Sequence, residues 1–323
     1  MQLIGNCHDV LRQDARRRFT LGVTVVHNEM RVWFFSRTHH MVSESFNFAT
    51  EPEILIRVLL SIAFASPEQL GYDTTMSYFI DDAGAAQYRI SLSKATYITT
   101  KLLSDNRSDV ICGRATRVWE AYREDDPDRV SVAIKDLWMS ADIVQEGTQL
   151  LELHEKLHAL PDPGTPRPPG DYFLTVLAHG FVPTSRGVDD DTFDVMMRGH
   201  SFPIEDADYG HRKHYRIIFQ EVGVPVDSLT TLSDIMHALA DATRGISTSP
   251  VSTLLLFTLS PALLLLHRLH LVHRDVSAGN IMLFNGVGKL SDLEYLKSFQ
   301  GPLSATGDGY IVPLSLLYFL AIY

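Results

Sequence analysis

At 323 residues the chain is long enough for two lobes or domains with a large buried core. Its 45% apolar and 21% charged residues are typical of a globular protein and exclude a disordered one. The formal net charge of −11 argues against nucleic acid as a partner, because phosphate contacts need clustered lysine and arginine.

The predicted elements of the first half are mainly strands. Residues 16–37 place β-branched and aromatic residues on both sides of a short polar turn, which predicts a hairpin. Residues 51–66 predict a helix with acidic residues in its first turn. A loop and a second hairpin follow over 70–92, and 111–136 predicts two strands joined by an acidic Asp-Pro turn.

Helices become more frequent in the second half. Residues 140–160 predict a strong helix, and the Pro/Gly-rich residues 161–170 predict a loop. A strand is expected over 215–222 and a capped helix over 227–245. Strands first and helices later predict an α+β fold with a β-rich part before a helical part.

The number of cysteines and the N-terminal sequence indicate the cellular compartment of the protein. Cys7 and Cys112 are too few for a disulfide framework or a zinc site, and residues 1–19 lack the apolar segment of a signal peptide. We therefore expect an intracellular protein, cytoplasmic or nuclear. The apolar runs 251–266 and 310–323 each contain a proline and are shorter than the roughly 20 residues of a spanning helix. A membrane is therefore not the expected partner, although these runs leave that alternative open.

Two histidine-rich segments invite a metal interpretation. Residues 37–40 read RTHH and residues 211–216 read HRKHYR, but neither has ligand spacing with carboxylates. We expect both segments to be solvated surfaces.

The segment 271–297 carries the strongest chemical pattern. His-Arg-Asp at 273–275 is followed five residues later by Asn280, as in the kinase pattern H-R-D-x-x-x-x-N. In that pattern the Asp orients the attacking hydroxyl and the Asn holds a metal ion. A short apolar strand and a GVG turn then lead to Asp292, at the place of a second metal-holding carboxylate. Phosphoryl transfer needs this minimum, because positioning and charge neutralisation supply most of its catalysis.

Candidate partners lie upstream in the order in which a kinase needs them. Lys135 ends the stretch VAIK, and Gly113 precedes it across a strand–turn–strand segment. Glu146 shares the apolar face of the following helix, so we choose it as the ion-pair partner of Lys135, although Glu152 has the more usual sequence distance. The stretch EVG at 221–223 ends a strand as a hinge would. The glycine loop is the weakest member, because GRATRV retains only one glycine.

Taken together, these segments resemble the fungal-type protein kinase family, a divergent branch of the protein-kinase fold. RRRFTLGVTVVHNEMRVWFFSR, SFNF and LGYD resemble the N-terminal extension of that family, and GRATRVWEA, VAIKDLW, YRIIFQEVGVPV, DIMHALADA and VHRDVSAGNIM resemble its kinase core. The resemblance implies a bilobal α+β fold with an extension over 1–105, an N-lobe with hinge over 106–225 and a partial helical C-lobe over 226–323.

The resemblance also implies an ATP- and Mg²⁺-dependent phosphotransferase acting on Ser/Thr hydroxyls of a protein substrate. It assigns roles to individual residues. The catalytic roles fall on Asp275, Lys135 and Asn280, the nucleotide contacts on Gly113, Lys135, Glu146, Glu221 and Gly223, and the Mg²⁺ ligands on Asn280 and Asp292.

Some features depart from that family's pattern. Asp292-Leu293-Glu294 lacks the usual glycine, and no A-P-E-like element follows it. We therefore expect an incomplete C-lobe. The low-complexity residues 246–266 and the final apolar tail suggest translated intron or frameshifted sequence, which sequencing of the mature transcript would test.

Two alternatives to an active protein kinase stay open at this point. One is a pseudokinase or inactive remnant that works as an interaction module, which the poor glycine loop favours. The other is a small-molecule kinase, because Asp292-x-Glu294 and the Ser-x-Gly-Asn ending of the catalytic loop also resemble aminoglycoside and choline kinases.

Overall fold

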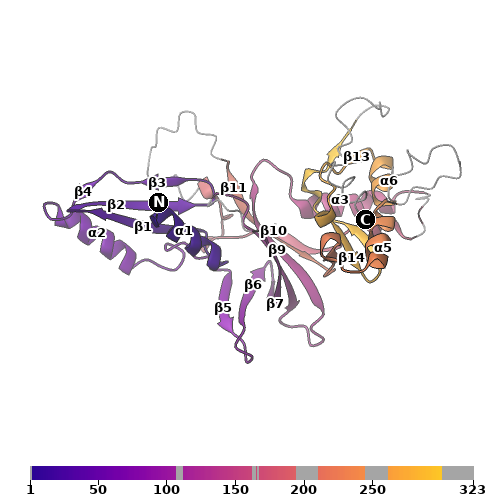
Figure 1. Ribbon diagram of the computed structural model, residues 1–323, viewed down its shortest axis with the longest axis horizontal. Coiled ribbons are helices and arrows are strands. Elements are labelled where there is room, and N and C mark those ends of the chain that lie inside the picture. Colours follow the sequence, from indigo (N-terminus) through magenta and orange to yellow (C-terminus); the bar gives the residue numbers. More distant parts are fainter. Residues whose placement is uncertain are drawn as a thin grey trace. The chain divides into compact units, whose positions relative to one another are not determined.

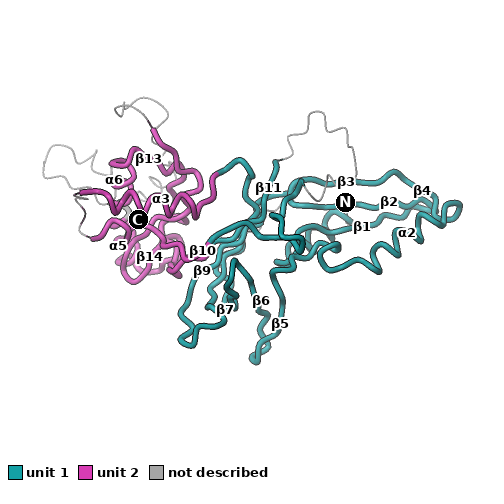
Figure 2. Tube along the Cα trace, turned by 180° about the vertical axis from the view of Figure 1, so that it is seen from behind, with its two compact units in different colours: residues 1–143, 179–217 teal, residues 144–178, 218–323 magenta. Residues whose placement is uncertain are grey.

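The structure is a computed structural model that describes residues 2–106, 112–161, 165, 167–193, 210–243 and 261–299 (Figure 1). It is a mixed fold with a β-rich first part, as the sequence predicts. The chain forms two compact units, shown in different colours in Figure 2. Unit 1 contains residues 1–143 and 179–217, and unit 2 contains residues 144–178 and 218–323.

Unit 1 begins with a small sheet that carries a helix. Strands β1 and β2 form the predicted hairpin, in which Val26 pairs with Glu29 across a two-residue turn. Strands β3 and β4 both pair with β2. The predicted helix over 51–66 is present as α2, whereas the first helix, α1, was not predicted. The bounds are α1 Gln2–Gln13, β1 Phe19–Val26, β2 Glu29–Ser36, β3 His40–Val42, β4 Phe46–Asn47 and α2 Pro52–Ala63.

Helix α1 lies close against β1 because β1 has a glycine at the contact. A Cβ atom on Gly22 would lie 2.8 Å from a methyl carbon of Leu3 and 3.1 Å from the sulfur of Cys7, so a larger residue would require these side chains to move. The contact buries Cys7, Leu11 and Phe35 in one apolar cluster. Both cysteines of the chain are free, in agreement with the absence of a predicted disulfide.

The larger sheet of unit 1 has the strand order β10-β11-β9-β8-β7-β6-β5. The pairs β5–β6 and β8–β9 confirm two of the predicted hairpins. The long strand β7 between them was not predicted, and its pairing with β8 shifts register twice. The bounds are β5 Met76–Ile80, β6 Ala86–Leu92, β7 Ala95–Asn106, β8 Thr116–Arg123, β9 Ser131–Ser140, β10 Val176–Phe181 and β11 Arg212–Phe219.

The histidine-rich segments are not solvated surfaces, so that prediction was wrong. Residues 212–216 belong to β11, where Arg216 is 0% and His214 is 2% exposed. Arg37 and His39 of the other segment are buried as well. Buried charge requires paired charge, and distant parts of the chain supply it. We call the following set the buried charge cluster: Arg18, Asp73, Asp136, Asp190, His214 and Arg216.

The buried charge cluster predicts a stability that decreases with pH. Burial alone would lower the pKa of His214, but Asp136 and Asp190 raise it from 6.5 to about 9. Because the folded state holds the proton more tightly than the unfolded state, the stabilisation is complete below about pH 6.5 and lost as the pH rises through about 9. Urea unfolding across this window should therefore give a decreasing free energy of unfolding, and His214→Gln should flatten that decrease. An equal pH dependence of both proteins would contradict the assignment.

Unit 2 packs helices against short strands. The predicted helix over 140–160 is present as α3, and the predicted helix over 227–245 as α5, which packs against β14 and β15. Strands β12, β14 and β15 form one sheet, and β13 pairs with β16. The bounds are α3 Glu146–His158, η1 Pro169–Tyr172, β12 Val224–Pro225, η2 Val226–Ser228, α5 Leu232–Thr243, α6 Pro261–Arg268, β13 Leu271–Val272, η3 Ala278–Asn280, β14 Ile281–Phe284, β15 Val287–Leu290, η4 Leu293–Tyr295 and β16 Lys297–Ser298.

The turn before β15 lies at 285–286, earlier than the predicted Gly-Val-Gly turn at 286–288. Asn285 and Gly286 form the turn with φ values of 49° and 75°, and Phe284 pairs with Val287. Two consecutive positive φ values match the twist of a tight hairpin, for which Asn-Gly is the preferred pair. Gly288 was predicted to lie in the turn, but it belongs to strand β15.

Gly288 is expected to tolerate no side chain. A Cβ atom there would lie 2.2 Å from the carbonyl oxygen of Ala238 on α5, a backbone atom that cannot rotate away. Gly288→Ala should therefore lower the free energy of unfolding by about 1–3 kcal/mol or more, measured by urea unfolding. Gly5→Ala is the matched control, because the added methyl group would meet nothing within 4 Å and should stabilise α1 by up to about 1 kcal/mol. Equal stabilities of the two variants would contradict the close packing of α5.

The apolar runs fall mostly on undescribed residues. Residues 251–260 and 310–323, like most of the proposed insertion at 246–266, lie outside the described part of the chain. Among the helices that are described, none combines the length and the apolar character needed to cross a membrane.

Candidate functional site

The candidate catalytic loop lies in unit 2 between β13 and β14, and His273 holds its start. His273 is buried, and its Nε2 donates a hydrogen bond to the carbonyl oxygen of Ser291 at 2.9 Å. The backbone N–H of Asp275 donates to Nδ1 of His273 at 3.3 Å. These two bonds fit a neutral imidazole, and burial lowers the pKa of His273 although Asp275 and Asp292 act in the opposite direction. His273 therefore joins the loop to the residue before Asp292 without carrying charge.

Asn280 closes the same loop onto Asp275. Its Nδ2 donates to the carbonyl oxygen of Asp275 at 2.8 Å and to the carboxylate Oδ2 at 3.2 Å. The backbone N–H and the hydroxyl of Ser291 both donate to the carbonyl oxygen of Asn280, at 2.9 and 3.0 Å. The five-residue spacing recognised in the sequence thus becomes one hydrogen-bonded unit that Ser291 links to Asp292.

The backbone is strained at two points of this unit. Arg274 has a φ of 70° and Asp292 a φ of 60°, values in the left-handed region that only a few per cent of non-glycine residues adopt. Such conformations persist where surrounding bonds hold them, and they concentrate at functional sites. Here the bond from His273 to Ser291 joins the two residues that immediately precede the strained positions.

The donor chemistry of this unit fits a magnesium ion. Mg²⁺ is held in phosphotransferases by one or two carboxylates, amide oxygens and the substrate phosphates. Asp292 supplies a carboxylate and Asn280 keeps its amide oxygen, because its two bonds to Asp275 use only the NH₂ group. No group of three or more His, Cys, Asp and Glu side chains within the described residues forms a metal site of the protein-only kind.

The predicted hinge residues lie in unit 2 and are tied to the strand that leads to Asp292. The buried carboxylate of Glu221 accepts hydrogen bonds from the backbone N–H and the hydroxyl of Thr175, both at 2.8 Å, and pairs with Lys289 Nζ at 3.1 Å. Both carboxylate oxygens of Glu221 are therefore already bonded, so a ligand at this position would contact backbone groups and not the side chain. Gly223 is packed so closely that a Cβ atom would lie 3.0 Å from the Cβ of Met282.

Lys135 and Gly113 both lie in unit 1. Lys135 is 9% exposed on β9, where it pairs with Val118 of β8. The backbone N–H of Gly113 donates to the carbonyl oxygen of Arg37 at 2.9 Å, so this bond must open before Gly113 can donate to a phosphate. Residues 107–111 of the same loop lie outside the described residues.

Glu146 begins α3 in unit 2 and is buried, whereas Glu152 is exposed and lies 4.0 Å from Lys156. Lys135 belongs to unit 1, so its pairing with Glu146 stays a prediction.

No short-range pattern in the sequence identifies the partners of the predicted residues. Lys289, which holds Glu221, and the buried charge cluster beside Lys135 had no local signal, because their partners are distant in the sequence. The one clue was that basic residues recur at every second position, at Arg212, His214 and Arg216, which places them on one face of a strand.

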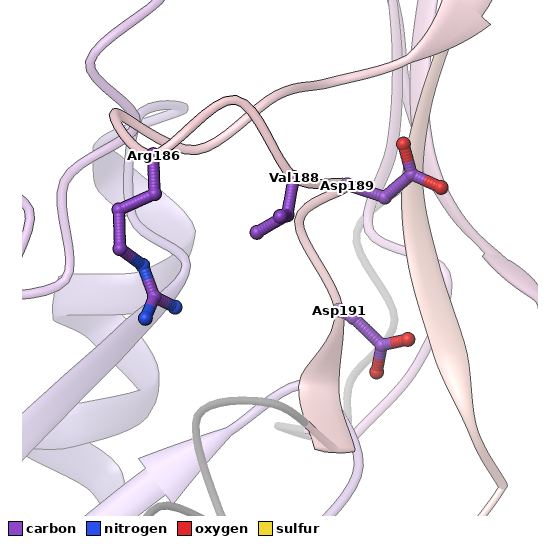
Figure 3. A pocket seen from close by; sticks show the side chains of 4 residues that line it. All are labelled: Arg186, Val188, Asp189 and Asp191. Carbon is purple, nitrogen blue, oxygen red and sulfur yellow. The ribbon is translucent and has the colours of Figure 1, made fainter.

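A surface pocket of about 420 Å³ lies elsewhere in unit 1 and contains none of the predicted residues (Figure 3). It is lined by Arg186, Val188, Asp189 and Asp191. Its two carboxylates are already engaged, Asp189 by Lys213 and Asp191 by His211. We assign it no ligand.

Part of the chain is similar to a known protein family. Residues 1–159 match the family model described as fungal protein kinase, a range that includes Gly113, Lys135 and Glu146. Over this range the chain is therefore similar to protein kinases. Over residues 1–159 it is similar to the fungal-type protein kinase family, which confirms the resemblance recognised in the sequence.

A solved structure is also similar. It is described as the ROP18 kinase domain in complex with AMP-PNP and sucrose, with 11% sequence identity and a TM-score of 0.35. The match covers 79% of this chain and 63% of that chain. No curated protein matches the chain.

Proposed function

We propose that the chain is an ATP- and Mg²⁺-dependent protein kinase that transfers phosphate to Ser or Thr hydroxyls. The observation that carries the proposal is the hydrogen-bonded unit in which Asn280 holds Asp275 and His273 holds the residue before Asp292. Phosphoryl transfer requires this combination of a base-like carboxylate and separate metal-holding oxygens.

Each residue then has a defined task in the reaction. Asp275 orients the substrate hydroxyl and accepts its proton as the phosphate transfers. Asn280 and Asp292 hold Mg²⁺, which when bound neutralises charge on the phosphate oxygens.

The nucleotide contacts follow the same assignment. Lys135 contacts the phosphates and is oriented by Glu146. The adenine is bound by the main chain of 221–223, since the carboxylate of Glu221 is occupied by Thr175 and Lys289.

A pseudokinase is the second candidate, and one observation favours it. The N–H of Gly113 is bonded to Arg37, which removes a donor that a phosphate-binding loop would use. An interaction module needs no such donor. The retained Lys135, Asp275, Asn280 and Asp292 favour the enzyme instead, because binding alone does not require all four.

Thermal unfolding with and without Mg²⁺ and ATP tests nucleotide binding. At about 100 times its dissociation constant, ATP should stabilise the protein by roughly 2.7 kcal/mol. The shift should disappear in Lys135→Ala and persist in Lys101→Ala, an exposed lysine of β7. A transition insensitive to nucleotide would reject the kinase and support the pseudokinase. Phosphate transfer to a generic protein substrate, compared with a panel of hydroxylated metabolites, then separates a protein kinase from a small-molecule kinase.

A further inference from the structure

The buried charge cluster links the strand that carries Lys135 to the N-terminal extension. Its central member is Asp136, the residue next to Lys135 on β9, which is 3% exposed. Both oxygens of this carboxylate are bonded to side chains from β11. From Asp136 two chains of contacts run to the extension, and all of them lie within unit 1.

The first chain of contacts runs through Arg216. Its Nε donates to Asp136 Oδ2 at 2.5 Å, and its NH2 group donates to Asp73 Oδ2. Its NH1 group donates to the hydroxyl of Thr75 at 2.5 Å, and that hydroxyl donates to Asp73 Oδ1 at 2.7 Å. One guanidinium group thus fastens β9 to residues 73–75 of the extension.

The second chain of contacts runs through His214. Its Nε2 lies 3.0 Å from both carboxylate oxygens of Asp136, and its Nδ1 lies 3.4 Å from Asp190 Oδ2. Asp190 in turn accepts a hydrogen bond at 2.6 Å from Arg18 Nε, in the segment before β1. His214 also stacks on Trp138 of β9, with ring centroids 4.7 Å apart.

The two chains of contacts meet in the extension. The backbone N–H of Arg18 donates to the carbonyl oxygen of Gly71, and the N–H of Asp73 donates to that of Arg16, both at 2.8 Å. The contacts therefore form a closed circuit that starts and ends at Asp136. With His214 protonated, three cations balance three carboxylates, so the removal of one carboxylate leaves an uncompensated buried charge.

The circuit lies on the face of β9 opposite to Lys135. Neighbouring residues of a strand point to opposite faces, so Asp136 faces the circuit while Lys135 faces away from it. A separate hydrogen bond joins the extension to β8, the strand that pairs with β9. Arg117, the cross-strand partner of Asp136, donates to the carbonyl oxygen of Arg12 at 2.7 Å.

From this geometry we propose that the N-terminal extension is a positioning element for Lys135, acting from residues 16–75 through the circuit that ends at Asp136. The proposal rests on the proposed function, because it assumes that Lys135 contacts nucleotide phosphates. The extension is then not a separate module. Asp73 and Arg18 are positioning residues, which determine where β9 and its lysine lie without touching the nucleotide.

The test compares ATP·Mg²⁺ with adenosine, which lacks the phosphates that Lys135 contacts. Asp73→Asn, made in the full chain, should raise the dissociation constant for ATP·Mg²⁺ about 10-fold and leave that for adenosine unchanged, since adenosine has no phosphates. Hydrogen exchange of the β9 amides, residues 131–140, should become faster in the same variant. Asp73→Glu keeps the charge and should recover part of the ATP affinity. Glu124→Gln, in the exposed pair with Arg89, is the matched control and should change none of these quantities.

The outcomes separate the two proposals. If the unsubstituted chain binds neither ATP nor adenosine, the proposed function fails and this proposal fails with it. If it binds both and Asp73→Asn weakens both equally, or weakens neither, the positioning role alone is rejected. Should Asp73→Asn fail to fold, Thr75→Val removes one hydroxyl of the circuit and should change the ratio of ATP to adenosine affinity in the same direction.

Discussion

Asp275→Asn is expected to lower the rate of phosphate transfer about 10²–10⁴-fold, the usual contribution of a positioned base. The asparagine has the shape of the native side chain, and its amide oxygen can still accept the bond from Asn280 Nδ2. It cannot accept the proton of the substrate hydroxyl. Nucleotide affinity should be unchanged, because no nucleotide contact is assigned to Asp275. Transfer rates and nucleotide titrations on the same preparation measure both quantities.

The matched control for that substitution is Asp171→Asn. Asp171 is an exposed acid in η1 of the same unit, so its loss should affect neither transfer nor binding. Equal transfer by Asp275→Asn and the unsubstituted chain would reject the role of Asp275. A parallel loss of transfer in both variants would show that the assay responds to charge rather than to the catalytic loop.

Asp136→Asn is expected to lower the free energy of unfolding by about 3–5 kcal/mol, the cost of leaving a buried charge without its partner. Asp136 lies between Arg216 and His214, whose bonds to it measure 2.5 and 3.0 Å. These cations hold the pKa of Asp136 well below its ordinary value, although burial alone would raise it. The neutral amide keeps the volume of the carboxylate, but it removes the charge and turns one of the two accepting oxygens into a donor. Urea unfolding measures the loss.

Glu124→Gln again provides the comparison. Its ion pair with Arg89 is 2.8 Å long, but both side chains are more than 40% exposed. Exposed pairs contribute at most about 1 kcal/mol, so this variant should be nearly as stable as the unsubstituted chain. If Asp136→Asn lost no more than Glu124→Gln, the buried charge cluster would not be the main electrostatic support of unit 1.

Local elements could be predicted because the information they need lies within a few residues. The hairpin β1–β2 follows from β-branched and aromatic residues on both sides of a short polar turn, and α3 follows from its apolar period. The same locality explains the loop: Asp275 and Asn280 are five residues apart, and their side chains meet directly. The turn before β15 was predicted at the Gly-Val-Gly stretch 286–288, but it forms at Asn285 and Gly286. Local sequence was therefore not enough to choose between two overlapping turn signals, of which Asn-Gly is the one preferred in tight hairpins.

Burial of charge could not be predicted, because it depends on partners that the chain brings from far away. HRKHYR has the composition of a surface, yet Arg216 is fully buried against Asp73, a residue 143 positions earlier. Likewise, Glu221 has the position of a hinge residue, but only the fold revealed that Lys289 and Thr175 occupy its carboxylate.

The sequence by itself determined the family resemblance, most of the hairpins and helices, and the spacing of the catalytic loop, since each depends on short-range periodicity or on a motif. Only the tertiary structure decided which charges are buried and how the extension is joined to the strand of Lys135. The physical reason is that a charge enters the interior only with an opposite charge beside it, and that partner is chosen by the fold, not by the neighbouring sequence.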